Sequence, residues 1–175
     1  MTPIQARAVW ALVLCTLTTL LGFVLLSGPM RTAEIAAVLA VLHLDANQLS
    51  AVSGHAIQAL PEKGLAFRVQ VTPYCSSLIA VLALGGIAGF ILHGPILLRL
   101  RAFAGAAAMI VACNVVRIAA SVWVGLRFGA GDLVLFHNWV GTLFALAYTL
   151  IGFLFMLYLM LPKRQETAQT LEVAR

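Results

Sequence analysis

Charged side chains are scarce in this chain of 175 residues. Asp, Glu, Lys and Arg together make up 10% of it, and only 6 of those residues are acidic, whereas a soluble domain usually carries about 25% charged residues. This shortage excludes an ordinary soluble domain and a disordered chain. The 3 cysteines are too few for a disulfide-stapled secreted module. The net charge of +5 comes from scattered basic residues, so we expect no nucleic-acid partner.

Long apolar runs dominate what is present, since 62% of the residues are hydrophobic. A transmembrane helix needs about 20 mostly apolar residues. We predict an all-α polytopic membrane protein, a single integral membrane domain over residues 1–175. The expected spans are four: about 8–26, which we expect Gly28-Pro29 to end, then about 76–92, 102–124 and 138–161.

The segment of about residues 28–74 is expected to be extracytoplasmic. Its apolar stretch 32–44 is too short for a span, so we expect a short interfacial helix or one that packs on the others. If it did span, every later loop would change sides. Residues 65–72 alternate apolar and polar side chains, as a half-buried strand does, and Pro61-Glu62-Lys63-Gly64 before them is typical of a turn. A small strand-containing segment is therefore expected.

Basic residues near the expected spans indicate the orientation. With four spans, one group falls on one side (Arg7, Arg99, Arg101, Lys163, Arg164) and a sparser group on the other (Arg31, Lys63, Arg68, Arg127). The positive-inside rule places the first group on the cytoplasmic side. We expect the protein to be integral to the cytoplasmic (inner) membrane.

Three reactive side chains then share one depth on the extracytoplasmic side. Cys75 lies at the start of the second span and His137 at the start of the fourth. Arg117 lies about 15 residues into the third span, or about 22 Å at about 1.5 Å per residue. An arginine inside a span costs about 2.5–3.5 kcal/mol, so Arg117 is a functional candidate unless it snorkels to lipid phosphate. Asn114, one helical turn before it, lies on the same face.

These residue types suit acyl transfer by a cysteine. A thiol attacks as thiolate, which a helix N-terminus or a nearby cation stabilises. The oxyanion that forms needs a fixed donor such as Arg117, and the leaving amine needs a proton, which His137 can supply. Taken singly, each residue also has a plain structural interpretation as packing, capping or anchoring.

Three local motifs resemble the exosortase/archaeosortase family of membrane protein-sorting enzymes. They are Thr72-Pro73-Tyr74-Cys75-Ser76-Ser77, Asn114-Val115-Val116-Arg117-Ile118, and His137 with Gly141. The resemblance covers about residues 64–161. It departs from the family at Ser77, where members commonly have glycine, and in the small number of spans.

The resemblance implies a cysteine transpeptidase or protease that cleaves C-terminal sorting tails of exported proteins. Such a tail combines a short motif, a hydrophobic span and a basic cluster, and the acceptor would be a lipid, a glycan or water. By carry-over, Cys75 is the nucleophile, and Arg117 and His137 share the acid/base and stabilising roles in an order left open. Asn114, Tyr74 and Ser76 are candidate substrate contacts. We expect no cofactor and no metal, because no nucleotide or flavin motif and no metal-ligand spacing occurs.

Several interpretations remain beside this one. The chain could be a non-enzymatic transporter subunit or assembly factor that binds anions or lipid headgroups through Arg117, or an inactive family member that binds tails without cutting them. Cys15 and Cys113 are expected to serve packing. Asp132 is a candidate to orient His137, and Tyr148 is expected to anchor its helix.

Overall fold

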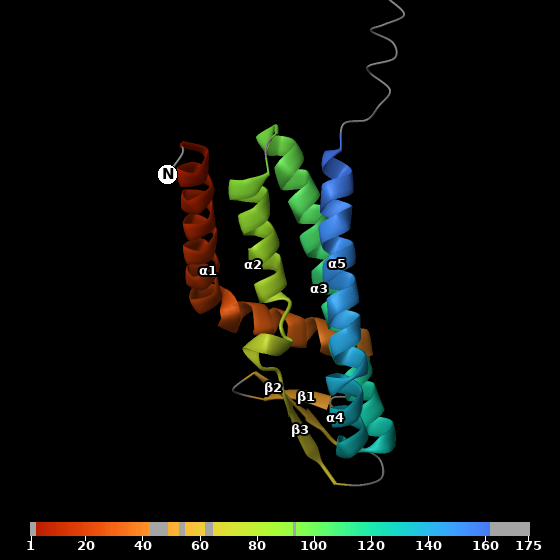
Figure 1. Cartoon of the computed structure of the whole chain (residues 1–175). Helices are drawn as coiled ribbons and strands as arrows, with labels where there is room; N and C mark the ends of the chain where they lie inside the picture. Colours follow the sequence, from red (N-terminus) through yellow and green to blue (C-terminus); the bar gives the residue numbers. More distant parts are fainter. Residues whose placement is uncertain (1–2, 43–48, 53–54, 62–64, 93, 162–175) are drawn as a thin grey trace, which may run out of the picture.

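The computed structural model describes residues 3–42, 49–52, 55–61, 65–92 and 94–161, and these are mostly helical. The helices are α1 (Pro3–Leu42), α2 (Leu78–Gly86) with its π-helical extension η2 (Ile87–Ile91), α3 (Ile96–Phe128), α4 (Ala130–Asn138) and α5 (Val140–Met160). The strands β1 (Leu49–Val52), β2 (Ala56–Ala59) and β3 (Phe67–Gln70) form an antiparallel sheet in the order β1-β2-β3. Figure 1 shows α2, α3, α5 and the first half of α1 alongside one another, with the sheet and α4 at one end.

Three helical stretches are long and apolar enough to cross a membrane: Val9–Leu42, Ile96–Phe128 and Ala130–Met160. They support a membrane protein, as the composition predicts. The second expected span, 76–92, corresponds to the shorter apolar stretch Leu78–Ile91. At about 1.5 Å per residue that stretch is about 21 Å long, less than the roughly 30 Å of a hydrocarbon core. The fold class is therefore helical with a small sheet. Within the described residues three helical stretches are long enough to span a membrane, so the expected count of four spans is not confirmed.

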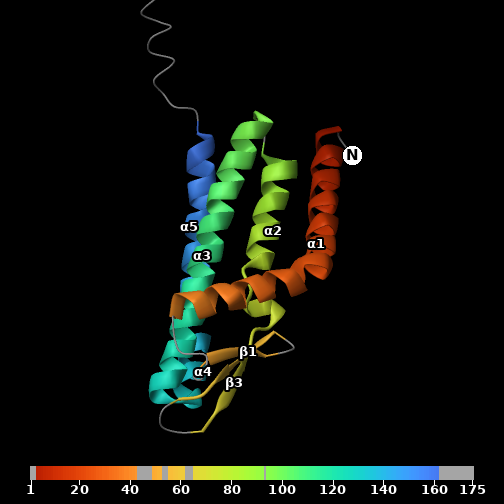
Figure 2. The same cartoon turned by 180° about the vertical axis from the view of Figure 1, so that it is seen from behind.

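The expected end of the first helix at Gly28-Pro29 is wrong, because α1 continues through Pro29. Figures 1 and 2 show α1 bending there, so that its second half lies crosswise to the other helices. Pro29 removes only one helical hydrogen bond and kinks rather than breaks the helix. Beside the bend, the Arg31 Nε donates to the Ser27 carbonyl at 2.9 Å and the Thr32 hydroxyl to the Gly28 carbonyl at 3.1 Å.

The half of α1 after the bend takes the place of the short helix expected over 32–44, of which residues 43–44 lie outside the described residues. Its buried side chains include Glu34, Ile35 and Val38, which one helical face presents together. This face packs between the sheet and α3, in a core that includes Ile57, Val71, Ile118 and Val122. Packing on the sheet and α3 therefore explains why this half of α1 lies crosswise to the other helices.

The alternation over residues 65–72 correctly predicted a strand, which the structure places at Phe67–Gln70 as β3. Phe67 and Val69 are half-buried, whereas Arg68 and Gln70 are exposed. The predicted turn at 61–64 lies mostly outside the described residues.

The third expected span is longer than predicted and the loop after it is helical. At about 1.5 Å per residue, α3 is about 50 Å long, so it projects past the bundle and flanks the sheet together with α4 (Figure 1). Gly129 adopts a φ of 107°, which favours glycine, and turns the chain between the two helices. His137 consequently lies in the last turn of α4 rather than at the start of a span.

Candidate active site

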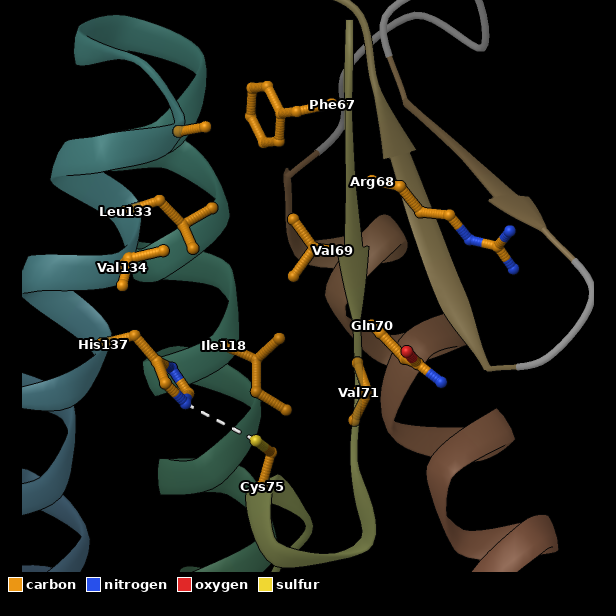
Figure 3. Close-up of a pocket in the computed structure, with 11 residues that line it drawn as sticks. Phe67, Arg68, Val69, Gln70, Val71, Cys75, Ile118, Leu133, Val134 and His137 are labelled. Carbon is orange, nitrogen blue, oxygen red and sulfur yellow. Dashed lines mark hydrogen bonds between the residues drawn. The ribbon is translucent and has the colours of Figure 1, made fainter.

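The Cys75 thiol lies in contact with the His137 imidazole. Cys75 ends the 3-10 turn η1 (Pro73–Cys75), in which its N–H donates to the Thr72 carbonyl at 3.0 Å. The Cys75 Sγ is 3.5 Å from His137 Nε2 and 3.1 Å from the Thr72 hydroxyl. Figure 3 shows the two side chains pointing toward each other from η1 and α4. A thiol and an imidazole thus meet at hydrogen-bond range, although 62 residues separate them, and such a pair has the geometry of a nucleophile and its base.

This environment makes the thiol more acidic. The hydrogen bond with His137 is the main cause that lowers the pKa of Cys75 from 9.0 to about 7. Burial of the thiol opposes this shift, and the Thr72 hydroxyl supports it. Near neutral pH a large part of Cys75 is therefore thiolate, the form that acts as a nucleophile.

Two further groups hold the His137 ring. The Ser121 hydroxyl lies 3.5 Å from Nδ1 and donates to the Arg117 carbonyl at 2.9 Å, so its oxygen is free to accept from Nδ1–H. Nε2 also lies 3.4 Å from the Arg117 Nη2. This arrangement favours a proton on Nδ1, so Nε2 is the nitrogen that takes the thiol proton and donates a hydrogen bond to the thiolate once Cys75 is ionised. Asp132, the expected orienting group, is exposed in the first turn of α4.

Arg117 is turned into the protein rather than outward to lipid. Its side chain is only 8% exposed, and its Nη1 donates to the Asn114 Oδ1 at 3.3 Å. Gly141 makes room for it, because a Cβ at Gly141 would lie 3.1 Å from Arg117 Nε and 3.7 Å from His137 Nδ1. This close approach gives the predicted pairing of His137 with Gly141 a physical reason.

Asn114 joins the nucleophile loop to the buried charges. Its amide donates to the Cys75 carbonyl at 3.1 Å and to the Glu34 Oε1 at 2.9 Å, while its Oδ1 accepts from Arg117 and from the Tyr148 hydroxyl. The side chain is 0% exposed and both of its polar atoms are used. These contacts favour a positioning role over the substrate contact expected from the sequence.

Glu34 anchors the turn that follows the nucleophile. Its Oε1 accepts from the Ser77 N–H at 2.9 Å and from the Ser77 hydroxyl at 2.7 Å, in addition to Asn114. Ser77 has φ −69° and ψ −7°, a conformation open to any residue, so the fold does not require glycine there. The departure from the family motif thus supplies a hydroxyl that binds Glu34.

Of the other two expected substrate contacts, one is exposed at the protein surface and one is buried. Tyr74 is 84% exposed beside Cys75, which leaves its ring open to solvent or a ligand. Ser76 is buried, and its hydroxyl accepts from the Leu78 N–H at 3.3 Å at the start of α2. Of the two, only Tyr74 is accessible in this structure.

A cavity of about 270 Å³ opens above the thiol. One wall is β3 with the following Val71, and the other includes Ile118 of α3 and Leu133 and Val134 of α4 (Figure 3). Cys75 and His137 line the same cavity. A reacting group bound there would lie against both of them.

The sequence interpretation missed three members of this network: Glu34, Ser121 and Tyr148. Ser121 was detectable, because it follows Arg117 by one helical turn on the same face. Glu34 is an acidic residue inside an apolar stretch, which is itself a signal of a buried role. Tyr148, which was expected to anchor its helix, is 5% exposed and donates to Asn114 inside the bundle.

The remaining cysteines pack between helices. Cys15 of α1 packs directly against Gly86 of α2, and Cys113 is partly buried against the cluster between α2, α3 and α5. Within the described residues, no group of three His, Cys, Asp or Glu side chains could hold a metal ion. Comparison of the chain with known protein families, curated proteins and solved structures gave no match.

Proposed function

We propose that this chain is a membrane cysteine transpeptidase or protease of the exosortase/archaeosortase type. The observation that carries the proposal is the Cys75 thiol, whose pKa is about 7, within 3.5 Å of His137 Nε2 and at the floor of a cavity. The Asn-x-x-Arg-Ile motif supports it further, because its Arg117 contacts the same imidazole nitrogen.

In the first chemical step, the Cys75 thiolate attacks a peptide carbonyl of the substrate and His137 holds the thiol proton on Nε2. The carbon–sulfur bond forms, the carbon–nitrogen bond of the tetrahedral intermediate breaks, and His137 returns the proton to the leaving amine. A thioester remains on Cys75. An acceptor hydroxyl, amine or water then attacks it, giving its proton to His137 and releasing the thiolate.

The two basic side chains take different roles because an arginine does not lose its proton in proteins. His137 is therefore the acid/base. While His137 Nε2 is unprotonated, it accepts a hydrogen bond from the Arg117 Nη2. Once Nε2 carries the thiol proton, the Arg117 Nη2 is free to donate to the developing oxyanion. A lipid-headgroup site at Arg117 would need an accessible guanidinium, and this one is 8% exposed.

The membrane arrangement belongs to the same proposal. The α2 helix with η2 is the fourth crossing of the inner membrane, and the end that carries the sheet and α4 faces the extracytoplasmic side. Arg99 and Arg101 lie at the start of α3, at the other end of the bundle, which is the cytoplasmic end by the positive-inside rule. The substrates are exported proteins with a motif, a hydrophobic span and a basic cluster at the C-terminus.

The test compares intact cells that make the native chain with cells that make Cys75→Ala. Quantitative mass spectrometry of exported proteins with such tails would measure the uncut C-terminal peptides. We expect uncut precursors to accumulate with Cys75→Ala and to stay at the native level with Cys15→Ala or Cys113→Ala. Processing that continues in the Cys75→Ala cells would overturn the mechanism and favour a binding protein.

A further inference from the structure

The outer edge of the sheet lies next to the active-site cavity. β3 is the last strand in the order β1-β2-β3, so one of its edges has no neighbouring strand in the part of the chain that the structure describes. The Val71 N–H donates to the His55 carbonyl at 2.9 Å, in register with the pairing of Gln70 opposite Ala56. Because hydrogen-bonded and non-hydrogen-bonded pairs alternate in an antiparallel ladder, the backbone N–H and C=O of Gln70 point away from β2.

The cavity follows this edge. It is lined by every residue from Phe67 to Val71, although consecutive side chains of a strand point to opposite faces. Figure 3 shows the Phe67 and Val69 side chains pointing toward the helices and those of Arg68 and Gln70 pointing away, so the latter two residues line the cavity close to their backbone. The cavity therefore runs along the length of the strand and reaches its backbone. Cys75 lies at the Val71 end of this cavity, next to His137, as Figure 3 shows.

We propose that this cavity binds an extended peptide segment as an added strand on β3, which delivers one of its carbonyls to Cys75. The inference rests on the proposed function and names how the substrate is held. Backbone hydrogen bonds to Gln70 align the segment. An apolar side chain of the segment packs against Ile118, Leu133 and Val134.

The shape and charge of the cavity select this occupant. Its volume of about 270 Å³ is slightly below the roughly 300–1,000 Å³ of ligand sites, so it holds a short stretch of chain. Helix α4 stands opposite β3 across the cavity. The side chains that face the cavity are mostly apolar, and the Arg68 side chain points away from it (Figure 3). Apolar residues next to the cleavage site are therefore preferred.

The test uses the full chain in detergent with Cys15→Ala and Cys113→Ala, so that Cys75 is the one thiol. The probe is a capped tripeptide of valine and alanine that ends in a vinyl sulfone, to which a thiolate adds. Methyl vinyl sulfone is the control without a peptide, and two further probes carry an N-methyl group on one or the other internal amide. Mass spectrometry follows the adduct on Cys75, and the readout is the rate of each probe divided by the rate of methyl vinyl sulfone.

We expect the tripeptide to saturate and to exceed methyl vinyl sulfone by at least about tenfold. N-methylation should lower the ratio by about threefold to tenfold at one amide, with a smaller effect at the next, because alternate residues face β3. Gln70→Pro should lower the tripeptide ratio to a similar extent, since it removes the outward N–H, and proline is accepted at such edge positions. Gln70→Ala keeps that N–H and should keep the ratio.

Three results would overturn the inference. A tripeptide ratio that neither N-methylation nor Gln70→Pro changes would exclude strand addition while leaving an activated Cys75, and with it the proposed function, in place. Failure of Cys75 to react with methyl vinyl sulfone near neutral pH would remove the proposed function itself. A dimer that Gln70→Pro converts to a monomer would show that the edge joins two copies of this chain. If Gln70→Pro does not fold, the N-methylated probes make the same comparison on the unaltered edge.

Discussion

Replacing His137 by alanine should change the pH at which Cys75 ionises. The hydrogen bond from His137 is the largest cause of the fall of the Cys75 pKa from 9.0 to about 7, and burial of the thiol acts in the opposite direction. Without His137, the burial that raises the pKa and the Thr72 hydrogen bonds that lower it remain and oppose each other. The pKa of the thiol in His137→Ala is therefore expected to return toward 9.0.

The size of the effect follows from two opposing terms. At pH 6 about 9% of the native thiol and about 0.1% of the variant thiol are ionised, a ratio of about ninety. A thiolate of lower pKa is also a weaker nucleophile, by about eightfold for two pKa units in thiol–disulfide exchange. The native thiol should then react about tenfold faster at pH 6, the two profiles should cross near pH 8, and the variant should react several-fold faster above about pH 10.

The assay follows the reaction of Cys75 with an aromatic disulfide that releases a coloured thiolate, in a chain with Cys15→Ala and Cys113→Ala. His55→Asn is the matched control, because His55 contacts the Thr32 hydroxyl and has a φ of 59°, which asparagine tolerates. This control should keep the native profile. Native and His137→Ala profiles that superimpose, or a native midpoint near pH 9, would refute the activation of Cys75 by His137.

Two further substitutions test the network behind the thiol. Glu34→Ala removes the acceptor that three buried donors share. We expect this variant to lower the free energy of unfolding by about 2–4 kcal/mol, and Glu34→Gln to lie between it and the native chain. An unchanged thermal midpoint of unfolding in detergent would contradict the anchoring role of Glu34. Gly141→Ala places a methyl group 3.1 Å from the Arg117 Nε, and the resulting displacement of a few tenths of an ångström should slow substrate processing by less than about tenfold. Gly131→Ala, whose Cβ would meet nothing within 4 Å, should process normally; equal rates for both variants would show that the guanidinium tolerates the shift.

Local sequence determined the parts of this protein that depend on local chemistry. Apolar runs of sufficient length predicted the helices of α3 and α5, since a helix satisfies its backbone groups within one segment. Alternation predicted β3, because the two faces of a strand meet different surroundings. The motifs around Cys75, Arg117 and His137 named three residues that the fold does bring together, and their catalytic roles remain predictions.

Tertiary structure decided the features that depend on distant partners. Glu34 lies 43 residues from Ser77 and 80 residues from Asn114, so no local pattern could pair them. The continuation of α1 through Pro29 was equally hidden, because packing of its second half on the sheet and α3 outweighs the one hydrogen bond that proline removes. The apolar character that makes a helix a candidate membrane span depends only on length and composition, so it can be predicted from the sequence. The site is a set of close approaches, which exist only after α1, α3, α4 and the sheet have packed around one thiol.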